Sequence, residues 1–375
     1  MNDNPLLDTS GLPAFDRIRP EHVTPAIESL LAKANEALER AVSPDVPAEY
    51  EALSAVLDVA TERLGRSWGA VNHLKAVADS PELRAAFNEN LPRVTEFHTR
   101  MGSDDRLYAK YKAIHDSPAG ANLSAARRRA LSNALRDFVL SGAELRDEAK
   151  RRFAEIQEQA AQLSQKYSEH VLDATDGFSY YATDAELQGV PADVKQAARD
   201  SAAAEGREGH KITLHFPSYF PVMQYGANRA LRETLYRAYV TRASDVGSAE
   251  LDNSQLMAEL LRLRQEEARL LGYPNFSAMS LVPKMAETPE QVTAFLRDLA
   301  VKARAGGERD LTELRDFAAR ELGLHELQAW DIPYASERLK ESRYAFSEQE
   351  VKQYFTAPKA LAGLFQIVQT LFEVT

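Results

Sequence analysis

The amino-acid sequence predicts a mainly α-helical protein made of multi-helical lobes, with one small β-hairpin-like insertion near residues 177–216. Apolar residues recur at spacings of three and four along most of the 375 residues, as in helices with one buried face. That spacing breaks down only around the insertion. There is no glycine- and serine-rich linker and no fixed-period repeat, so we expect lobes that pack on one another.

Four helices are predicted in the N-terminal part. The first covers residues 21–42, with Pro25 in its first turn, where the amide hydrogen that proline lacks has no intrahelical acceptor. A second helix begins at Ser80-Pro81-Glu82, because serine caps a helix and proline suits its first position. A third begins near Ser124, and a long fourth helix covers residues 144–172. The apolar face of the first helix consists of Val23, Ile27, Leu30, Leu31, Ala34 and Leu38.

The insertion carries two strand signals. Residues 177–182 are short and aromatic, and residues 211–216 alternate apolar with polar side chains. Residues 191–204 between them read as a helix. Pro217 and Pro221 then close the second strand and open one helix that runs through Leu231, Leu235 and Tyr239.

Two helix starts towards the C-terminus resemble capping boxes, Thr288-Pro289-Glu290-Gln291 and Ser347-Glu348-Gln349-Glu350. The last predicted helix ends in an apolar run at residues 372–375, although natural chain ends are more often polar and frayed. This fits a chain cut within a domain, which leaves an apolar stripe for absent partner segments. A terminal helix that docks on its own lobe is the alternative. The stripe consists of Leu361, Leu364, Phe365, Val368, Leu371 and Phe372.

Composition excludes several classes of protein. The chain has no cysteine, and therefore no disulfide framework, thiol nucleophile, iron–sulfur cluster or thiolate zinc site. Its 45 basic and 56 acidic residues give a net charge of −11, which repels phosphate backbones, so we expect no nucleic-acid partner. Neither a secretory signal nor a run of eighteen apolar residues is present, so we expect no membrane association and a cytoplasmic location.

Histidine spacing does not reveal a zinc site. A compact site places two histidines four residues apart on a helix, with a glutamate after the first to act on the bound water. His325-Glu326 begins this pattern, but Ala329 stands where the second ligand must be, so we interpret the segment as a turn or helix end. His210 and His215 are five apart on a predicted strand, so their side chains are expected on opposite faces.

Other catalytic motifs are missing from the sequence as well. It contains no Gly-x-Ser-x-Gly elbow, no Gly-x-x-x-x-Gly-Lys phosphate loop and no Gly-x-Gly-x-x-Gly fingerprint. Gly306-Gly307 lies within a helical region without a preceding strand. The basic run Arg127-Arg128-Arg129 is interpreted as a solvated helix face, with anion binding as the alternative. Residue types and spacings therefore assign no catalytic, cofactor-binding or metal-binding residue.

Three segments carry a more specific signal. Residues 236–245 read YRAYVTRASD and resemble a stretch of the thimet-oligopeptidase family of zinc metallopeptidases. Residues 270–286 resemble that family's LLGYxNF segment with its following SL and KMA. Residues 330–337 are similar to its WDxxYYSE signature, with Ala335 in place of the second tyrosine. The opening at residues 4–23 looks most like a bacterial member, and the resemblance covers essentially the whole chain.

The resemblance implies two mainly helical lobes around a deep channel, in which one zinc ion supports cleavage of short peptides. It implies a helical N-terminal lobe at 1–175, a small β-containing insertion at 176–222, and the start of the catalytic domain at 223–375. The family's zinc ligands, a His-Glu-x-x-His motif and a later glutamate, lie beyond the end of this sequence, so none is carried over. Zinc is expected in the full-length family member and not in this chain.

We therefore expect the N-terminal part of a zinc metallo-oligopeptidase, inactive alone, whose possible partner is a C-terminal half supplied in trans. Its substrates in the complete enzyme would be short peptides. The alternative is a non-catalytic helical peptide-binding or regulatory module derived from the family.

Overall fold

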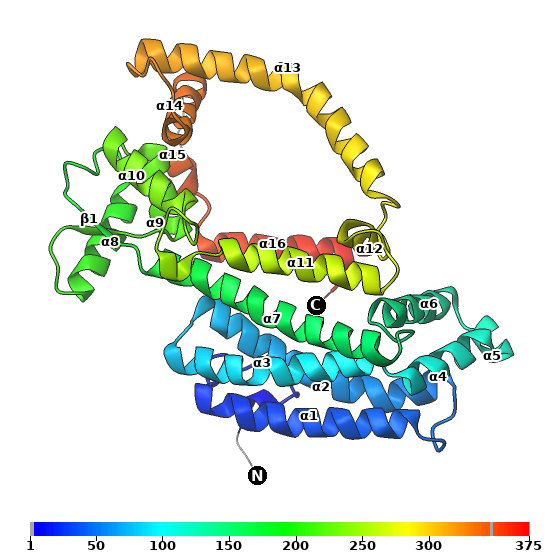
Figure 1. The fold of residues 1–375 in the computed structure, drawn as a ribbon. Helices are drawn as coiled ribbons and strands as arrows, with labels where there is room; N and C mark the ends of the chain where they lie inside the picture. Colours follow the sequence, from blue (N-terminus) through cyan, green and yellow to red (C-terminus); the bar gives the residue numbers. More distant parts are fainter. Residues whose placement is uncertain (1–3, 346–347, 375) are drawn as a thin grey trace. The chain divides into compact units, whose positions relative to one another are not determined.

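The computed structural model describes residues 4–345 and 348–374 of the chain and is mainly helical, as predicted (Figure 1). It divides into two compact units. The first unit comprises Met1–Tyr167 and Gln255–Thr293, and the second comprises Ser168–Ser254 and Ala294–Thr375. Within the described ranges, no helix is both long and apolar enough to cross a membrane.

The first unit is built on three long helices that lie side by side, α1 (Pro20–Val42), α2 (Tyr50–Val77) and α3 (Pro81–Gly102) (Figure 1). All six residues of the predicted stripe on α1 are buried. Ser80 caps α3 as predicted, because its side chain accepts a hydrogen bond from the Leu83 amide at 3.2 Å. The unit continues through 3₁₀ helix η1 (Pro5–Leu7), α4 (Asp105–Asp116), α5 (Pro118–Ala121), α6 (Ala125–Leu140), α7 (Asp147–Asp176), α11 (Ser254–Leu270) and α12 (Phe276–Leu281), of which α7 ends in the second unit.

The second unit contains the predicted β-hairpin-like insertion. Strands β1 (Tyr180–Ala182) and β2 (His210–Ile212) pair antiparallel, with Tyr181 opposite Lys211, and α8 (Ala192–Ala204) connects them. Both strands are shorter than predicted, because the chain has already begun α9 (Phe216–Tyr225) at the end of the second predicted strand. A core beneath this sheet consists of Leu187, Ile212, Leu214, Val222, Met223 and Leu235.

The single helix predicted after Pro217 is two helices, α9 and α10 (Arg229–Val240). The backbone leaves the helical conformation at Gly226, which has φ of −66° and ψ of 122°. A glycine is needed there because a side chain would come within 2.6 Å of the Val222 carbonyl oxygen. Asn228 then starts α10, accepting a hydrogen bond from the Leu231 amide at 3.1 Å. The prediction missed this second start because the apolar spacing continues across it.

The remaining elements are η2 (Ala249–Leu251), α13 (Pro289–Glu321), η3 (Ala329–Asp331), α14 (Ile332–Tyr344), α15 (Glu348–Lys352) and α16 (Ala357–Phe372). At the start of α13, the Gln291 amide donates to the Thr288 hydroxyl at 3.1 Å, and the Gln291 side chain accepts from the Glu287 amide at 2.7 Å. This resembles the predicted capping box. The second predicted box begins at Ser347, which lies outside the described residues.

Candidate functional site

The most polar buried site in the second unit surrounds Asp331, the last residue of η3. Its carboxylate has no exposed surface and accepts hydrogen bonds from Arg232 at 2.8 Å and Arg229 at 2.7 Å. The Gln328 amide donates a further bond at 3.1 Å. The two arginines are three residues apart on α10, so they lie on the same face of that helix. Arg232 is itself only 1% exposed, so this is a buried ion pair.

Aromatic rings surround the same ion pair. The guanidinium of Arg232 lies 4.3 Å from the ring centre of Tyr334, and that of Arg237 lies 5.0 Å from Trp330. The Tyr236 and Trp330 rings are 6.0 Å apart. The sequence segments 236–245 and 330–337 are therefore in contact through their aromatic and charged side chains.

Glu337 is a second buried carboxylate, on α14. It accepts a hydrogen bond from Gln224 of α9 at 2.8 Å, and Lys340 lies 3.0 Å from the same oxygen, Oε2. Its other oxygen, Oε1, is buried and has no hydrogen-bond partner in the described structure. Ala335, the residue that departs from the family signature, is fully buried and packs with Leu314 and Ala318 of α13.

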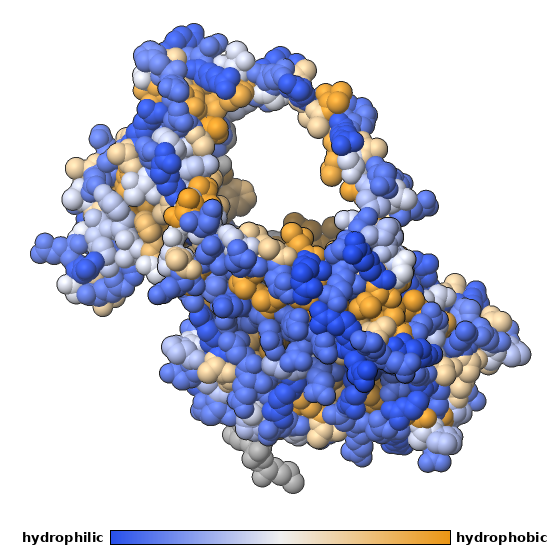
Figure 2. All heavy atoms as spheres, viewed as in Figure 1, coloured by the Kyte–Doolittle hydropathy of each residue, from blue (hydrophilic) through white to orange (hydrophobic). Residues whose placement is uncertain are grey.

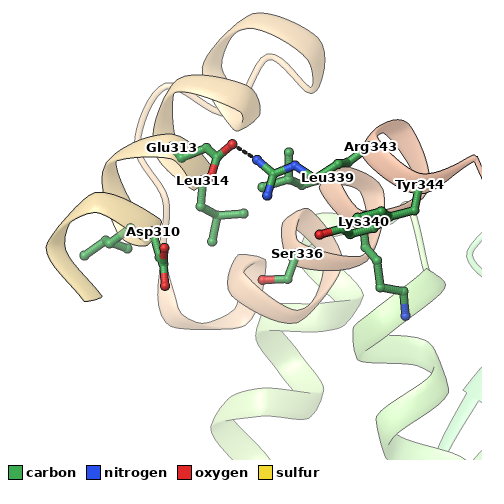
Figure 3. A pocket seen from close by; sticks show the side chains of 9 residues that line it. Asp310, Glu313, Leu314, Ser336, Leu339, Lys340, Arg343 and Tyr344 are labelled. Atoms are coloured by element: carbon green, nitrogen blue, oxygen red, sulfur yellow. Dashed lines mark ion pairs between the residues drawn. The ribbon is translucent and has the colours of Figure 1, made fainter. Parts of the chain in front are cut away.

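A cavity of about 460 Å³ lies between the C-terminal half of α13 and α14, and we call it the α13–α14 pocket (Figure 3). Acidic side chains line it from α13 (Asp310 and Glu313), and basic side chains line it from α14 (Lys340 and Arg343). Glu313 and Arg343 form an ion pair between the two helices. Buried Leu314 and half-buried Leu339 supply apolar surface.

The histidines considered from sequence do not come together as a metal site. His325 and Glu326 lie in a bend between α13 and η3, where the Glu326 carbonyl accepts a hydrogen bond from Arg229 at 2.9 Å. Among the described residues, no group of three His, Asp or Glu side chains is placed to hold a metal ion.

The prediction that His210 and His215 share a strand is wrong. β2 ends at Ile212, and His215 precedes α9. His210 is buried, with Nδ1 3.3 Å from the Ala182 carbonyl oxygen, whereas His215 Nε2 lies 2.8 Å from Asp176 Oδ1.

The arginine run is exposed on α6, as interpreted from the sequence, and the glycine pair lies inside a helix. Arg127 pairs with Glu51 at 2.6 Å, and Arg128 donates to the Leu123 carbonyl at 2.5 Å, so both contact their own unit. Gly306 and Gly307 lie in the middle of α13, within the helical region predicted.

The segment 270–286 also has a structural explanation. Gly272 ends α11 in the left-handed conformation with φ of 81°, which favours glycine. Asn275 then caps α12 by accepting a hydrogen bond from the Ala278 amide at 2.9 Å. A glycine and an asparagine at these places stop one helix and start the next.

Sequence reasoning missed the α13–α14 pocket entirely. Its charged residues belong to two helices joined by an irregular connection, and their spacing follows only the ordinary helical period. Both helices carry acidic and basic residues along their length, so the facing of acids by bases is visible only once the pairing of the two helices is known.

Comparison with known proteins identifies relatives along the whole chain. The model of peptidase family M3 matches residues 222–375, and that of the neurolysin/thimet oligopeptidase N-terminal domain matches residues 27–150. The chain is 45% identical to oligopeptidase A of Salmonella typhimurium and of Escherichia coli over 375 residues, 99% of this chain and 55% of each relative. A probable cytosolic oligopeptidase A of Arabidopsis thaliana is 40% identical over 388 residues, 100% of this chain and 54% of the relative. The chain thus spans about half the length of these curated relatives.

Proposed function

We propose that this chain, which belongs to peptidase family M3, is the N-terminal part of an oligopeptidase A-like zinc metallopeptidase that hydrolyses short peptides. The observation that carries the proposal is the 45% identity to oligopeptidase A across 99% of the chain. The contact between segments 236–245 and 330–337 supports it, because two segments that resemble the family pack together through Tyr236, Arg237 and Trp330.

The described residues of this chain do not fit a zinc site, since no suitable group of ligands is present among them. No residue of this chain is therefore assigned a role in zinc chemistry. In our proposal the zinc ligands come from the part of the family's length that the chain does not match. This chain alone is then inactive.

Exposed apolar side chains in the second unit support a partner polypeptide. Phe295 and Leu296 of α13 are 61% and 57% exposed, and Figure 2 shows apolar residues at the surface along this helix. No described residue of α16 is buried, and its Phe365 is 67% exposed. Exposed apolar surface of this extent is characteristic of an interaction site. We propose that this surface binds the catalytic half of the family fold supplied in trans.

Complementation tests the proposal directly. The purified 375-residue chain is mixed with the unmatched C-terminal part of the Escherichia coli relative, and cleavage of a quenched-fluorescent peptide is followed with zinc and with a chelator. We expect zinc-dependent cleavage from the mixture and none from either part alone. Cleavage by the isolated chain, or failure of the two parts to associate, would contradict the proposal.

A second candidate, a non-catalytic peptide-binding or regulatory module, is favoured by the α13–α14 pocket, which belongs entirely to this chain. Peptide binding by the chain alone, combined with no activity in any mixture, would support this candidate over the first.

The net charge and the name of a relative suggest which partners and which location are expected. The net charge of −11 favours neither nucleic acid nor an anionic membrane surface as a partner. We propose a cytoplasmic location, in line with the cytosolic name of the Arabidopsis relative. Fractionation of cells that express a tagged chain tests this location.

A further inference from the structure

We propose that the α13–α14 pocket binds a small zwitterion, a free amino acid or a dipeptide, with its ammonium group at Asp310 and its carboxylate at Arg343. Two features of the second unit lead to this inference. Acidic and basic side chains line opposite walls of the cavity, and the space between them has an apolar floor (Figure 3).

Asp310 is the group available to a cation. In the described part of the chain, its carboxylate has neither an ion-pair nor a hydrogen-bond partner, although it lines the pocket. Lys340, a basic residue of α14 that also lines the pocket, is engaged elsewhere: its ammonium lies 3.0 Å from Glu337, and in Figure 3 it points away from Asp310. A ligand ammonium would therefore supply the missing counter-charge.

Arg343 is the group available to a carboxylate. It pairs with Glu313 across the top of the pocket, and it is itself exposed. A guanidinium has five N–H donors, so one carboxylate on it leaves donors for a second. The Ser336 and Tyr344 hydroxyls point into the space below this pair and make no hydrogen bond within the described residues. They are placed to bind the second oxygen of a ligand carboxylate.

The volume of the pocket and its apolar lining residues indicate which class of ligand would fit. About 460 Å³ lies at the small end of the range of roughly 300–1,000 Å³ that is typical of ligand pockets. Leu314, which is 7% exposed, and Leu339 offer contact to one apolar side chain. A long peptide would not be contained, whereas an amino acid or a dipeptide with an apolar side chain fits both the volume and the charges.

This inference rests on the proposed function only for the supply of the ligand, because a peptidase produces short peptides with free ends. Binding is a property of this chain alone. If the dipeptide binds but the mixture shows no restored peptidase activity, the pocket proposal still holds. If activity is restored but the dipeptide does not bind, only the pocket proposal is overturned.

The test is isothermal titration calorimetry of the 375-residue chain with the dipeptide alanyl-leucine. We expect a Kd of about 1 mM or tighter. N-acetylation or C-amidation of the dipeptide removes one charge and should weaken binding roughly 10- to 100-fold, as expected for a lost hydrogen bond to a charged group. Asp310→Asn should weaken the free dipeptide but leave the N-acetylated form unchanged. Arg343→Gln should weaken binding of the free dipeptide and leave binding of the C-amidated dipeptide unchanged.

Matched controls come from the same helix. Arg304 and Glu308 pair with each other at 2.8 Å on exposed positions of α13 outside the pocket. Arg304→Gln and Glu308→Gln should therefore leave the affinity unchanged, and circular dichroism verifies that all four variants are folded. Equal affinity for free and capped dipeptides, equal losses in pocket and control variants, or no binding at 10-fold above the expected Kd would each overturn the inference.

Discussion

The buried ion pair of Asp331 and Arg232 gives the sharpest prediction for the stability of the second unit. Asp331→Ala removes a carboxylate with no exposed surface and leaves Arg232, which is 1% exposed, without a counter-charge. Arg232 keeps its hydrogen bonds to the Gly226 and Trp330 carbonyls at 2.7 and 3.2 Å, so the side chain stays in place while its charge is uncompensated.

The expected loss in the free energy of unfolding is about 3–5 kcal/mol, the usual cost of breaking a buried ion pair from one side. Arg229 adds little to this cost, because its side chain is 44% exposed and can be solvated once Asp331 is gone. A whole domain is stable by about 5–15 kcal/mol, so the change would remove a large share of that stability. Replacing both partners, as Arg232→Met with Asp331→Leu, should recover most of the loss because no buried charge remains.

Tryptophan fluorescence can follow the second unit separately. The chain has two tryptophans, Trp68 in the first unit and Trp330 beside the ion pair, so Trp68→Phe leaves Trp330 as the single reporter. Urea unfolding in this background compares Asp331→Ala with Asp298→Ala, which removes only an exposed carboxylate paired with Lys302. Equal midpoints and slopes for the two variants would refute the reasoning.

Acid should affect the same ion pair. Burial tends to raise the pKa of Asp331, but hydrogen bonds from Arg229, Arg232 and the Gln328 amide outweigh it, so the pKa lies below its usual value. The stabilisation is therefore present above the pKa of an unfolded aspartate, about 3.9, and is lost as the pH falls through the lower folded value. Asp331→Ala should lose less stability than the parent chain over that acidic range. An identical pH dependence of the two urea midpoints would contradict the assignment.

Three further substitutions test local structure. Gly307→Ala should stabilise α13 by about 1 kcal/mol, because an added methyl group meets nothing within 4 Å; a lower thermal midpoint would count against it. Ser80→Ala should cost about 1 kcal/mol in urea unfolding of the first unit, followed by Trp68, because the cap on the Leu83 amide is lost; Ser10→Ala, outside the helices, is the control. Ala243→Gly should stabilise the second unit by up to about 1 kcal/mol, since Ala243 has φ of 50°; a loss of stability in the Trp330 assay would contradict this.

The sequence was sufficient where one local signal determined one element. Ser80 followed by proline predicted the start of α3, and the stripe from Val23 to Leu38 predicted both α1 and its buried face. It was insufficient where tertiary contacts decided the outcome. The apolar period runs on from α9 into α10, and the break is marked by the extended backbone at Gly226 and the cap at Asn228.

The buried ion pair likewise depends on contacts between segments that are far apart in the sequence. The resemblance singled out segments 236–245 and 330–337, but neither segment reveals that Asp331 pairs with Arg232, about a hundred residues earlier. Arg229 and Arg232 lie on a helix with one other arginine, Arg237, and an arginine in an isolated helix is ordinarily solvated. The burial of Arg232 follows from the packing of η3 against α10, which no spacing in the sequence encodes.

Helix α16 shows most clearly that the burial of a helix face depends on what packs against it. Its apolar spacing predicted a helix, and the helix is present, but most of its apolar residues stay exposed, with Leu371 at 69% and Phe372 at 71%. An apolar period specifies that a face is to be covered without specifying which polypeptide covers it. Docking on its own lobe, the alternative considered from sequence, would have buried part of this face, and no described residue of α16 is buried. Each large apolar side chain covered by a partner would contribute about 1.5–3 kcal/mol, so covering several of them would favour binding of the catalytic half that we propose in trans.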